Sequence, residues 1–416
     1  MKQTIVFKNR TIRIDIGLLL ILIVFGLTSC FSLYNAFNLI KDGSGLSNLL
    51  KQVMWYGVGF GAMAFLCSFK NQVIFKYIKY AYLFLIGCLF YLFISRILVT
   101  ITGNPNIHLP FATPINGAIS WFRFPIIGGF QPSEFIKIVL IVMCAQIIRD
   151  HQDQYPNPAW KDDFHLLIKI GKVLIVPLIL IFLQPDTGLC IIILFNILVL
   201  LMCSGIRKQY IWVLFILVLS VVGGFFYLYF CQPEFLSEIV AGYRLQRIEA
   251  WLNPDSHIQG SSNQLYTALL SLGSAGLTGY GLQANIIAIP EAHTDFIFAA
   301  IGQCFGLIGT TFIVALCLLL DVYLCKIAYN TKDRMSRFIV IGVVAMLMYQ
   351  QIQNLGMIVG LLPITGITLP MISYGGSSIF SYFISFALIM NISPSSKKII
   401  YLNKPIKKLF TKKTHS

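Results

Sequence analysis

Long apolar runs separated by short polar segments organise the chain. A membrane-spanning helix needs about 20 apolar residues, and helices are the default because the lipid core has no water to satisfy backbone polar groups. A β-barrel would show alternating segments of about ten residues, and the sequence shows none. We therefore predict helices near residues 14–36, 53–69, 78–101, 132–148, 165–184, 188–204, 210–230, 296–325, 336–361 and 373–393.

The composition supports a membrane protein and excludes several other classes. Of 416 residues, 57% are hydrophobic and 11% are charged, whereas a soluble domain carries about 25% charged residues. A soluble enzyme and a disordered chain are both excluded. The ten cysteines form no CxxC pair and no zinc-like spacing, so neither a disulfide framework nor a structural metal is predicted.

The basic residues indicate topology rather than nucleic-acid binding. With the N-terminus inside, 24 of the 31 Lys and Arg residues fall on the inner side and five on the outer side, which follows the positive-inside rule. We predict an all-α polytopic membrane protein with about ten transmembrane helices and both termini cytoplasmic. Residues 1–396 form its membrane domain, and the basic tail 397–416 lies near anionic headgroups.

Two outer loops are unusually long, at about 102–131 and 231–295. Loops beyond about 15 residues are uncommon unless they are functional or disordered. The second loop, between the seventh and eighth helices, holds an amphipathic stretch at 238–251, a helical pattern at 264–272 and a glycine-rich piece at 273–281. We expect short helices at the outer interface or re-entering it, joined by tight turns.

Ionisable residues at the ends of apolar runs are candidates for function because the membrane makes them costly. Glu134 and Lys137 begin the fourth run behind Pro132, and their spacing places them on one helix face, where they can pair. A buried ion pair that only holds helices together fits the same spacing. Asp186 lies in the turn between the fifth and sixth runs, where turn formation alone also accepts an aspartate.

Two further clusters lie at outer ends of runs. Asp295 stands at an apolar boundary, where partial desolvation would raise its pKa and favour general-base chemistry. Thr294 and Asp295 are also good helix caps. The hydroxyl and glycine residues of 368–378 suit close helix packing or a substrate-lining backbone. In the ten-helix arrangement all these clusters lie outside, which predicts a polar cavity open to the exterior.

These pieces together resemble the shape, elongation, division and sporulation (SEDS) family, the group that contains RodA, FtsW and SpoVE. They occur in family order over nearly the whole chain. The matching pieces are Arg13-Ile14-Asp15, Phe130–Glu134 with Lys137, Gln184-Pro185-Asp186, Arg247-Ile248 with Trp251–Pro254, Pro290–Ala299 and Pro370–Ser378.

The resemblance implies a peptidoglycan glycosyltransferase that polymerises lipid II, an undecaprenyl-diphosphate-linked donor, at the outer face of the bacterial cytoplasmic membrane. It implies work in elongation or division with a class B penicillin-binding protein, no covalent cofactor, a divalent cation (Mg²⁺ or Mn²⁺) as an option, and no nucleic acid. Asp295 matches the family's essential aspartate. The implied substrate-binding residues are Glu134, Lys137, Asp186, Arg247, Gln264, His293 and Ser377.

The sequence also departs from the family pattern. Gln303-Cys304 stands where the family usually has an acidic pair. Two other functions therefore stay open. A lipid II flippase would use the same intramembrane polar residues, and a non-catalytic scaffold of the cell-wall synthesis complex would tolerate the loss of that acidic pair.

Overall fold

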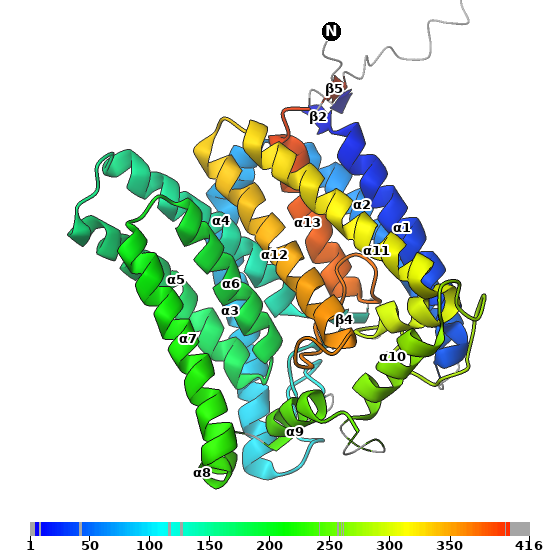
Figure 1. The fold of residues 1–416 in the computed structure, drawn as a ribbon. Coiled ribbons are helices and arrows are strands. Elements are labelled where there is room, and N and C mark those ends of the chain that lie inside the picture. The colour runs from blue at the N-terminus through cyan, green and yellow to red at the C-terminus, as the bar shows by residue number, and fades with distance from the viewer. Residues whose placement is uncertain are drawn as a thin grey trace, which may run out of the picture.

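Each apolar run forms one helix, and these helices stand side by side as a bundle (Figure 1). The computed structural model describes residues 5–7, 10–40, 44–114, 118–124, 128–240, 242–255, 258, 260, 262–395 and 397–399. The helices formed by the runs are α1 (Ile16–Asn35), α2 (Gly45–Cys67), α3 (Asn71–Thr102), α4 (Pro132–Gln154), α5 (Trp160–Leu183), α6 (Thr187–Cys203), α7 (Lys208–Cys231), α11 (Ile297–Asn330), α12 (Arg334–Ile358) and α13 (Gly376–Ile392).

The second long loop carries the short helices that the sequence predicts. They are α8 (Pro233–Ile239), α9 (Gly242–Leu252) and α10 (Asn263–Ser274), and a 3-10 turn, η1 (Phe37–Leu39), follows α1. Small strands, which the sequence analysis did not predict, complete the described structure. They are β1 (Ile5–Phe7), β2 (Arg10–Ile14) and β5 (Lys397–Ile399), antiparallel in the order β1-β2-β5, and the hairpin β3 (Phe122–Phe124) and β4 (Gly128–Phe130).

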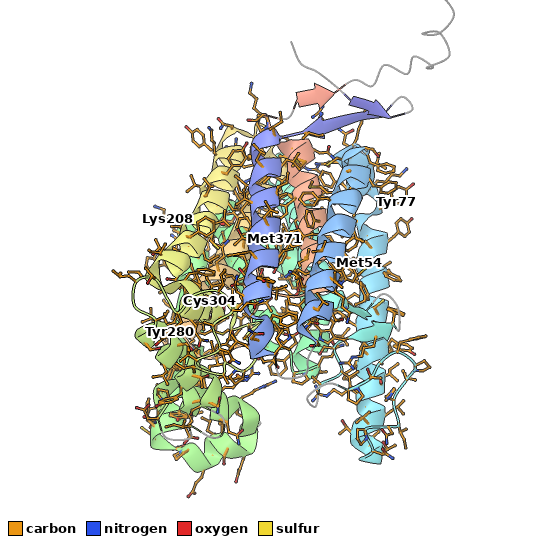
Figure 2. All side chains as sticks on the ribbon, turned by 90° about the vertical axis from the view of Figure 1, so that its right-hand side faces the viewer. Met54, Tyr77, Lys208, Tyr280, Cys304 and Met371 are labelled. Atoms are coloured by element: carbon orange, nitrogen blue, oxygen red, sulfur yellow. The ribbon has the colours of Figure 1, made fainter. Side chains whose placement is uncertain are left out.

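The bundle has the character of a membrane protein. Among the described residues, seven helices are long and apolar enough to cross a membrane, and α6 and α13 are shorter apolar helices. Large apolar side chains project outward from the bundle, for example Tyr77 on α3, which is 56% exposed (Figure 2). The protein is therefore an all-α, multi-pass membrane protein. Ten crossings and cytoplasmic termini stay predictions, and residues 400–416 of the predicted tail lie outside the described residues.

The centre of the bundle is formed by α4, α12 and α13. Helix α12 packs against α4, α6 and α11, and α13 packs most extensively against α2. By contrast, α7 lies at one edge and has no buried residue (Figure 1). The sheet β1-β2-β5 and the helices α8 to α10 lie at opposite ends of the bundle (Figure 1), so the chain's two long outer loops share the end that lies away from the sheet.

Helix α2 begins earlier than the hydrophobic pattern predicts, at Gly45 instead of residue 53. Its first turns carry Asn48 and Gln52, which are polar but buried. The amide of Gln52 donates to Oγ of Ser29 at 2.8 Å and to the carbonyl of Ser373 at 3.1 Å. These polar residues lower the hydropathy of the segment, so the apolar pattern does not reveal the start of the helix. The segment can still be buried because Gln52 finds hydrogen-bond partners inside the protein.

We predict that Gly59→Ala destabilises the bundle, whereas Gly57→Ala on the same helix does not. A Cβ at Gly59 would overlap the ring of Phe383, which is 0% exposed, whereas a Cβ at Gly57 meets no atom within 4 Å. Overpacking of this kind costs about 1–3 kcal/mol. Thermal unfolding in detergent measures the difference, and equal midpoints for the two variants would contradict the close approach of α2 and α13.

Candidate active site

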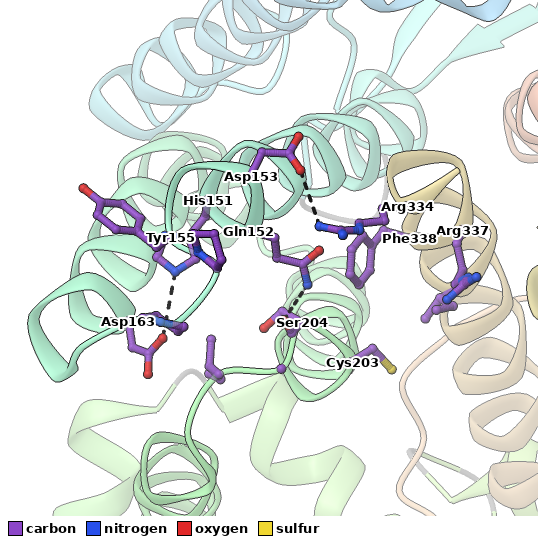
Figure 3. A pocket seen from close by; sticks show the side chains of 15 residues that line it. His151, Gln152, Asp153, Tyr155, Asp163, Cys203, Ser204, Arg334, Arg337 and Phe338 are labelled. Atoms are coloured by element: carbon purple, nitrogen blue, oxygen red, sulfur yellow. Dashed lines mark hydrogen bonds and ion pairs between the residues drawn. The ribbon is translucent and has the colours of Figure 1, made fainter. Parts of the chain in front are cut away.

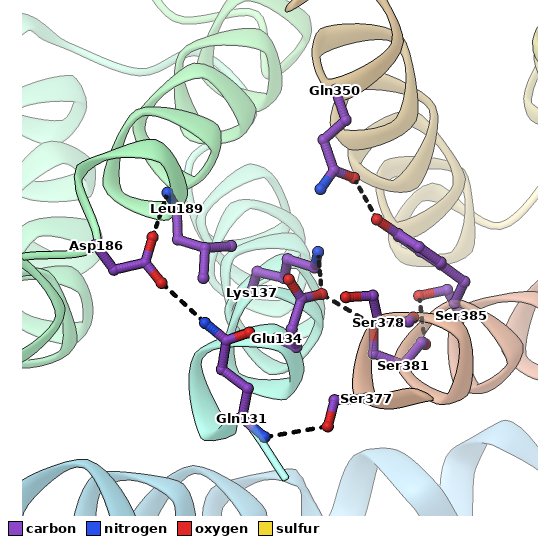
Figure 4. Close-up of polar contacts among 11 residues, drawn as sticks. Gln131, Glu134, Lys137, Asp186, Leu189, Gln350, Ser377, Ser378, Ser381 and Ser385 are labelled. Atoms are coloured by element: carbon purple, nitrogen blue, oxygen red, sulfur yellow. Dashed lines mark hydrogen bonds and ion pairs between the residues drawn. The ribbon is translucent and has the colours of Figure 1, made fainter. Parts of the chain in front are cut away.

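The start of α4 holds a buried ion pair. Pro132 and Glu134 occupy the first turn of α4, where an acid suits the positive end of the helix dipole. Nζ of Lys137 lies 2.6 Å from Oε2 of Glu134, and the two side chains are 0% and 8% exposed. From α13, the hydroxyl of Ser381 donates to the same oxygen at 3.5 Å, and the ring of Tyr382 lies 4.9 Å from the ammonium (Figure 4). The pairing predicted from the spacing is therefore present.

Asp186 both caps α6 and joins the α4 group. Its Oδ1 accepts from the backbone N–H of Leu189 at 3.3 Å, and its Oδ2 accepts from the amide of Gln131 at 2.9 Å (Figure 4). The pKa of Asp186 is raised to about 6, chiefly by burial and to a smaller extent by the nearby Glu134, although these hydrogen bonds and Lys137 act in the opposite direction. The turn-forming and site-forming readings of this residue are thus compatible.

Ser377 supports the backbone, which differs from the substrate-binding role implied by the family resemblance. Its Oγ accepts from the backbone N–H of Gln131 at 3.1 Å and donates to the carbonyl of Gly129 at 2.7 Å. The side chain is buried and holds the junction of β4 and α4, whereas the neighbouring Ser378 lines the cavity described below. These contacts give Ser377 a structural role at this junction, and its substrate-binding role stays a prediction.

Asp295 lies immediately before α11 without capping it. The N-cap residue is Phe296, and no side chain caps the helix there, so the capping alternative for Asp295 is wrong. Its Oδ1 accepts from the hydroxyl of Thr294 at 3.2 Å, and its backbone carbonyl accepts from the amide of Asn354 on α12 at 2.7 Å. The backbone of Asp295 is therefore held by the central helix of the bundle.

Arg247 on α9 faces the carboxylate of Asp295 across Gly366. A Cβ at Gly366 would lie 3.7 Å from the guanidinium of Arg247 and 3.8 Å from Oδ2 of Asp295, and Arg247 donates to the carbonyl of Thr365 at 3.2 Å. Burial raises the pKa of Asp295 to about 6, with Glu291 acting in the same direction and Arg247 opposing both. The carboxylate can thus hold or release a proton close to neutral pH.

The four polar clusters of the sequence meet at one cavity of about 600 Å³. Glu134, Asp186 and Thr294 line it, and Asp295 borders it at Gly366. Lys137 lies beneath Glu134, buried away from the cavity wall, so its charge acts through that carboxylate. The lining also includes residues from α2, α12 and the segments that begin α4 and α13: Lys51, Trp55, Gln131, Gln350, Tyr374 and Ser378.

Two predicted residues lie at or beyond the cavity's border. The carbonyl of His293 accepts from the backbone N–H of Tyr374 at 2.9 Å, and the centroids of the two rings are 5.9 Å apart, so His293 supports a cavity residue. Gln264 lies in the first turn of α10, half-buried, and does not line the described cavity. Gln350 and Asn354 had no predicted role, although amides inside the apolar run 336–361 were the signal that would have found them.

Metal ligands are not grouped at this site. Among the residues that the structure describes, no three His, Cys, Asp or Glu side chains are arranged to hold a metal ion. A divalent cation at this site stays a prediction.

A second cavity, of about 630 Å³, lies at the other end of α4 and α12 (Figure 3). His151 and Asp163 approach to 3.9 Å there, and Arg334 pairs with Asp153 at 3.4 Å. Between the two cavities, α12 buries Val343, Met346 and Leu347 completely. This packed apolar layer separates the cavities.

Known proteins resemble the chain over almost its whole length. The sequence profile of the family described as "Cell cycle protein", which groups FtsW, RodA and SpoVE, matches residues 13–398. A probable peptidoglycan glycosyltransferase FtsW of Geobacter sulfurreducens is 31% identical over 391 residues, which cover 92% of this chain and 96% of the relative.

Solved structures share the fold. RodA of Thermus thermophilus is 22% identical with a TM-score of 0.60, covering 91% of this chain and 96% of that one. A chain from a structure of a peptidoglycan synthase complex that coordinates polymerisation and crosslinking is also 22% identical, with a TM-score of 0.67, covering 91% and 97%. On the profile match and the extent of this sequence identity, the chain belongs to the FtsW/RodA/SpoVE family.

Proposed function

We propose that this chain is a peptidoglycan glycosyltransferase that polymerises lipid II at the outer face of the bacterial cytoplasmic membrane. The observation that carries the proposal is that Asp295 and Arg247 both approach Gly366, which lines a polar cavity within an apolar bundle. The relatives' names supply the reaction class, since the Geobacter sulfurreducens protein is named a probable peptidoglycan glycosyltransferase.

The chemistry joins the two sugars in one displacement. An acceptor hydroxyl attacks the anomeric carbon of the donor, the bond from that carbon to the lipid diphosphate breaks, and the hydroxyl proton passes to the carboxylate of Asp295. Undecaprenyl diphosphate leaves with the bonding electron pair. The guanidinium of Arg247 stabilises the negative charge that develops on the leaving oxygen, because charge-assisted hydrogen bonds to phosphate are strong.

The remaining predicted residues take supporting roles in this proposal. Glu134 and Asp186 belong to the polar lining of the cavity, where they accept hydrogen bonds from sugar hydroxyls. Lys137 holds the carboxyl group of Glu134 in place through their 2.6 Å contact. His293 and Gln264 lie on the loop that carries Asp295, and in this proposal they help to hold that loop in position. His293 lies in the turn before Asp295, and Gln264 lies in the first turn of α10. A divalent cation would enter with the substrate diphosphate, since Mg²⁺ is usually bound through one or two carboxylates plus substrate phosphates.

We also propose a class B penicillin-binding protein, a transpeptidase, as the partner. The chain that shares this fold in the synthase complex supports an assembly of polymerisation with crosslinking. The unpacked helix α7, which has no buried residue, offers apolar surface at the edge of the bundle for such a partner.

The flippase alternative fits the structure less well. Transport of a sugar headgroup needs a polar path between the two ends of the bundle. The two cavities have separate linings, and the fully buried Val343, Met346 and Leu347 lie between them on α12.

We predict that Asp295→Asn lowers kcat for glycan synthesis by about 10²–10⁴-fold, which is the usual worth of general-base catalysis. The substitution keeps size and shape but removes the proton acceptor. The assay follows conversion of lipid II into glycan strands by the purified protein with its transpeptidase. Asp153→Asn, at a surface carboxylate that is 61% exposed, is the matched control. Full activity of Asp295→Asn would remove this carboxylate from the mechanism.

Glycan synthesis should also depend on pH through Asp295. The base works as a carboxylate and its pKa is raised to about 6, so the rate should rise as pH increases through about 6 and fall on the acidic side. Because Glu291 raises this pKa, Glu291→Gln should move the acidic limb to lower pH. A limb that stays in place would assign it to another group, such as Asp186.

A double-mutant cycle separates the two readings of the ion pair. Glu134→Gln or Lys137→Met alone leaves one buried charge uncompensated, at a cost of about 3–5 kcal/mol. The double variant removes both charges and should regain most of the stability, measured by thermal unfolding. If Glu134 also binds substrate, the double variant stays stable but loses activity. Recovery of both stability and glycan synthesis would reduce the pair to a structural role.

A further inference from the structure

Helix α11 is broken near its start. Gly306 has φ 59° and ψ −149°, which interrupts the helical hydrogen bonds inside the apolar bundle. The glycine-rich piece of the second outer loop, residues 273–281, packs against this break, where Tyr280 lies near Cys304 (Figure 2). Its backbone pairs are Leu307 N–H to Gly276 O (3.0 Å), Ile308 N–H to Leu277 O (3.1 Å), Tyr280 N–H to Gln303 O (2.9 Å) and Gly281 N–H to Cys304 O (3.0 Å).

The side chain of Gln303 makes the next contact along this loop. Its Oε1 accepts from the backbone N–H of Ile286 at 2.9 Å and of Ile287 at 2.7 Å, and its Nε2 donates to the carbonyl of Ile287 at 3.1 Å. The side chain is 0% exposed. The Gln303 end of all three hydrogen bonds is therefore buried, while the loop end at Ile286 and Ile287 is partly exposed, so an unpaired amide at position 303 would be costly.

These contacts close a loop that contains the candidate catalytic carboxylate. The chain leaves Ile287, passes Asp295 and enters α11, and it returns to Gln303 after about two helical turns. The far end of the loop is held by Asn354, which donates to the carbonyl of Asp295 at 2.7 Å. Gln303 thus adds a restraint at the near end of the segment from Ile287 to Asp295, next to the hydrogen bond from the amide of Asn285 to the carbonyl of Asn38.

The chemistry of the contact selects an amide. One carboxamide both accepts two N–H groups and donates one, whereas an ionised carboxylate only accepts and would face the carbonyl of Ile287 with like partial charge. The departure from the family's acidic pair at Gln303 therefore coincides with a set of partners that an amide satisfies completely.

We infer that Gln303 is a positioning residue for the glycosyl-transfer reaction: its carboxamide clamps Ile286 and Ile287 onto α11 and thereby sets the position of Asp295. The inference rests on the proposed function for its catalytic consequence, but the clamp itself is a property of the folded chain that is measurable without substrate.

The test compares Gln303→Leu, Gln303→Glu and the wild-type protein by amide hydrogen exchange in detergent micelles. Gln303→Leu should raise exchange at residues 286 and 287 by about tenfold or more, as the loss of buried hydrogen bonds predicts, and should raise exchange toward Asp295 as well. Gln303→Glu keeps both accepting contacts, so its protection should lie between the other two. Gln152→Leu, which removes one amide hydrogen bond to the carbonyl of Ser204 at the other end of the bundle, should leave residues 286–295 unchanged.

Glycan synthesis supplies the second readout. A positioning defect should lower kcat by about tenfold or more, with a smaller change in KM for lipid II, because alignment of the base affects the chemical step more than binding. Unchanged exchange in Gln303→Leu would overturn the clamp. Raised exchange with wild-type kcat would overturn its positioning role. An inactive wild-type protein would instead refute the proposed function, and the exchange data would still decide whether the clamp exists.

Discussion

The break in α11 shows the constraint on which the rest of the structure depends: polar groups within an apolar bundle must find partners inside the protein. An unpaired backbone group costs several kcal/mol in a lipid-like environment. The loop 275–281 supplies those partners for the residues around Gly306. Both sides of the contact need glycine, because a Cβ at Gly279 or at Gly306 would overlap the opposing backbone. The second outer loop is thereby fixed against the bundle, and it carries Asp295 with it.

The same constraint sorts the carboxylates around the cavity. Both oxygens of Asp186 accept hydrogen bonds, and Glu134 is bound to Lys137. Asp295 differs, because Oδ1 accepts from Thr294 while Oδ2 faces Gly366 at the cavity's rim. Glu134 and Asp186 line the cavity, whereas Asp295 borders it at Gly366. What sets Asp295 apart is the nearby guanidinium of Arg247: a Cβ at Gly366 would lie 3.7 Å from Arg247 and 3.8 Å from Oδ2 of Asp295.

The sequence predicted the helices because ten apolar runs interrupted by polar segments leave few alternatives in a membrane. It misplaced the start of α2, because Gln52 is polar in sequence but paired in the fold. The small hairpin β3–β4 was missed, since two three-residue strands leave no clear periodicity. At the site, ionisable residues at the ends of apolar runs identified the region. The contact between Glu134 and Lys137 followed from their spacing along one helix. Contacts between distant segments were not predictable, because residues such as Ser377 and Gln131 meet only through the fold.

Gln303 bears on the choice between an enzyme and a scaffold. In the sequence, Gln303-Cys304 in place of the acidic pair leaves a non-catalytic scaffold open as an alternative. In the structure, the side chain of Gln303 makes three hydrogen bonds and Cys304 is buried. Neither side chain lines the described cavity. The substitution therefore changes how a loop is held and leaves the groups at the cavity in place. A scaffold relieved of selection for chemistry would have no need to keep Asp295 beside Arg247, with its carbonyl bound by Asn354. The retained geometry at Asp295 thus weighs more than the altered pair, and it favours the enzyme.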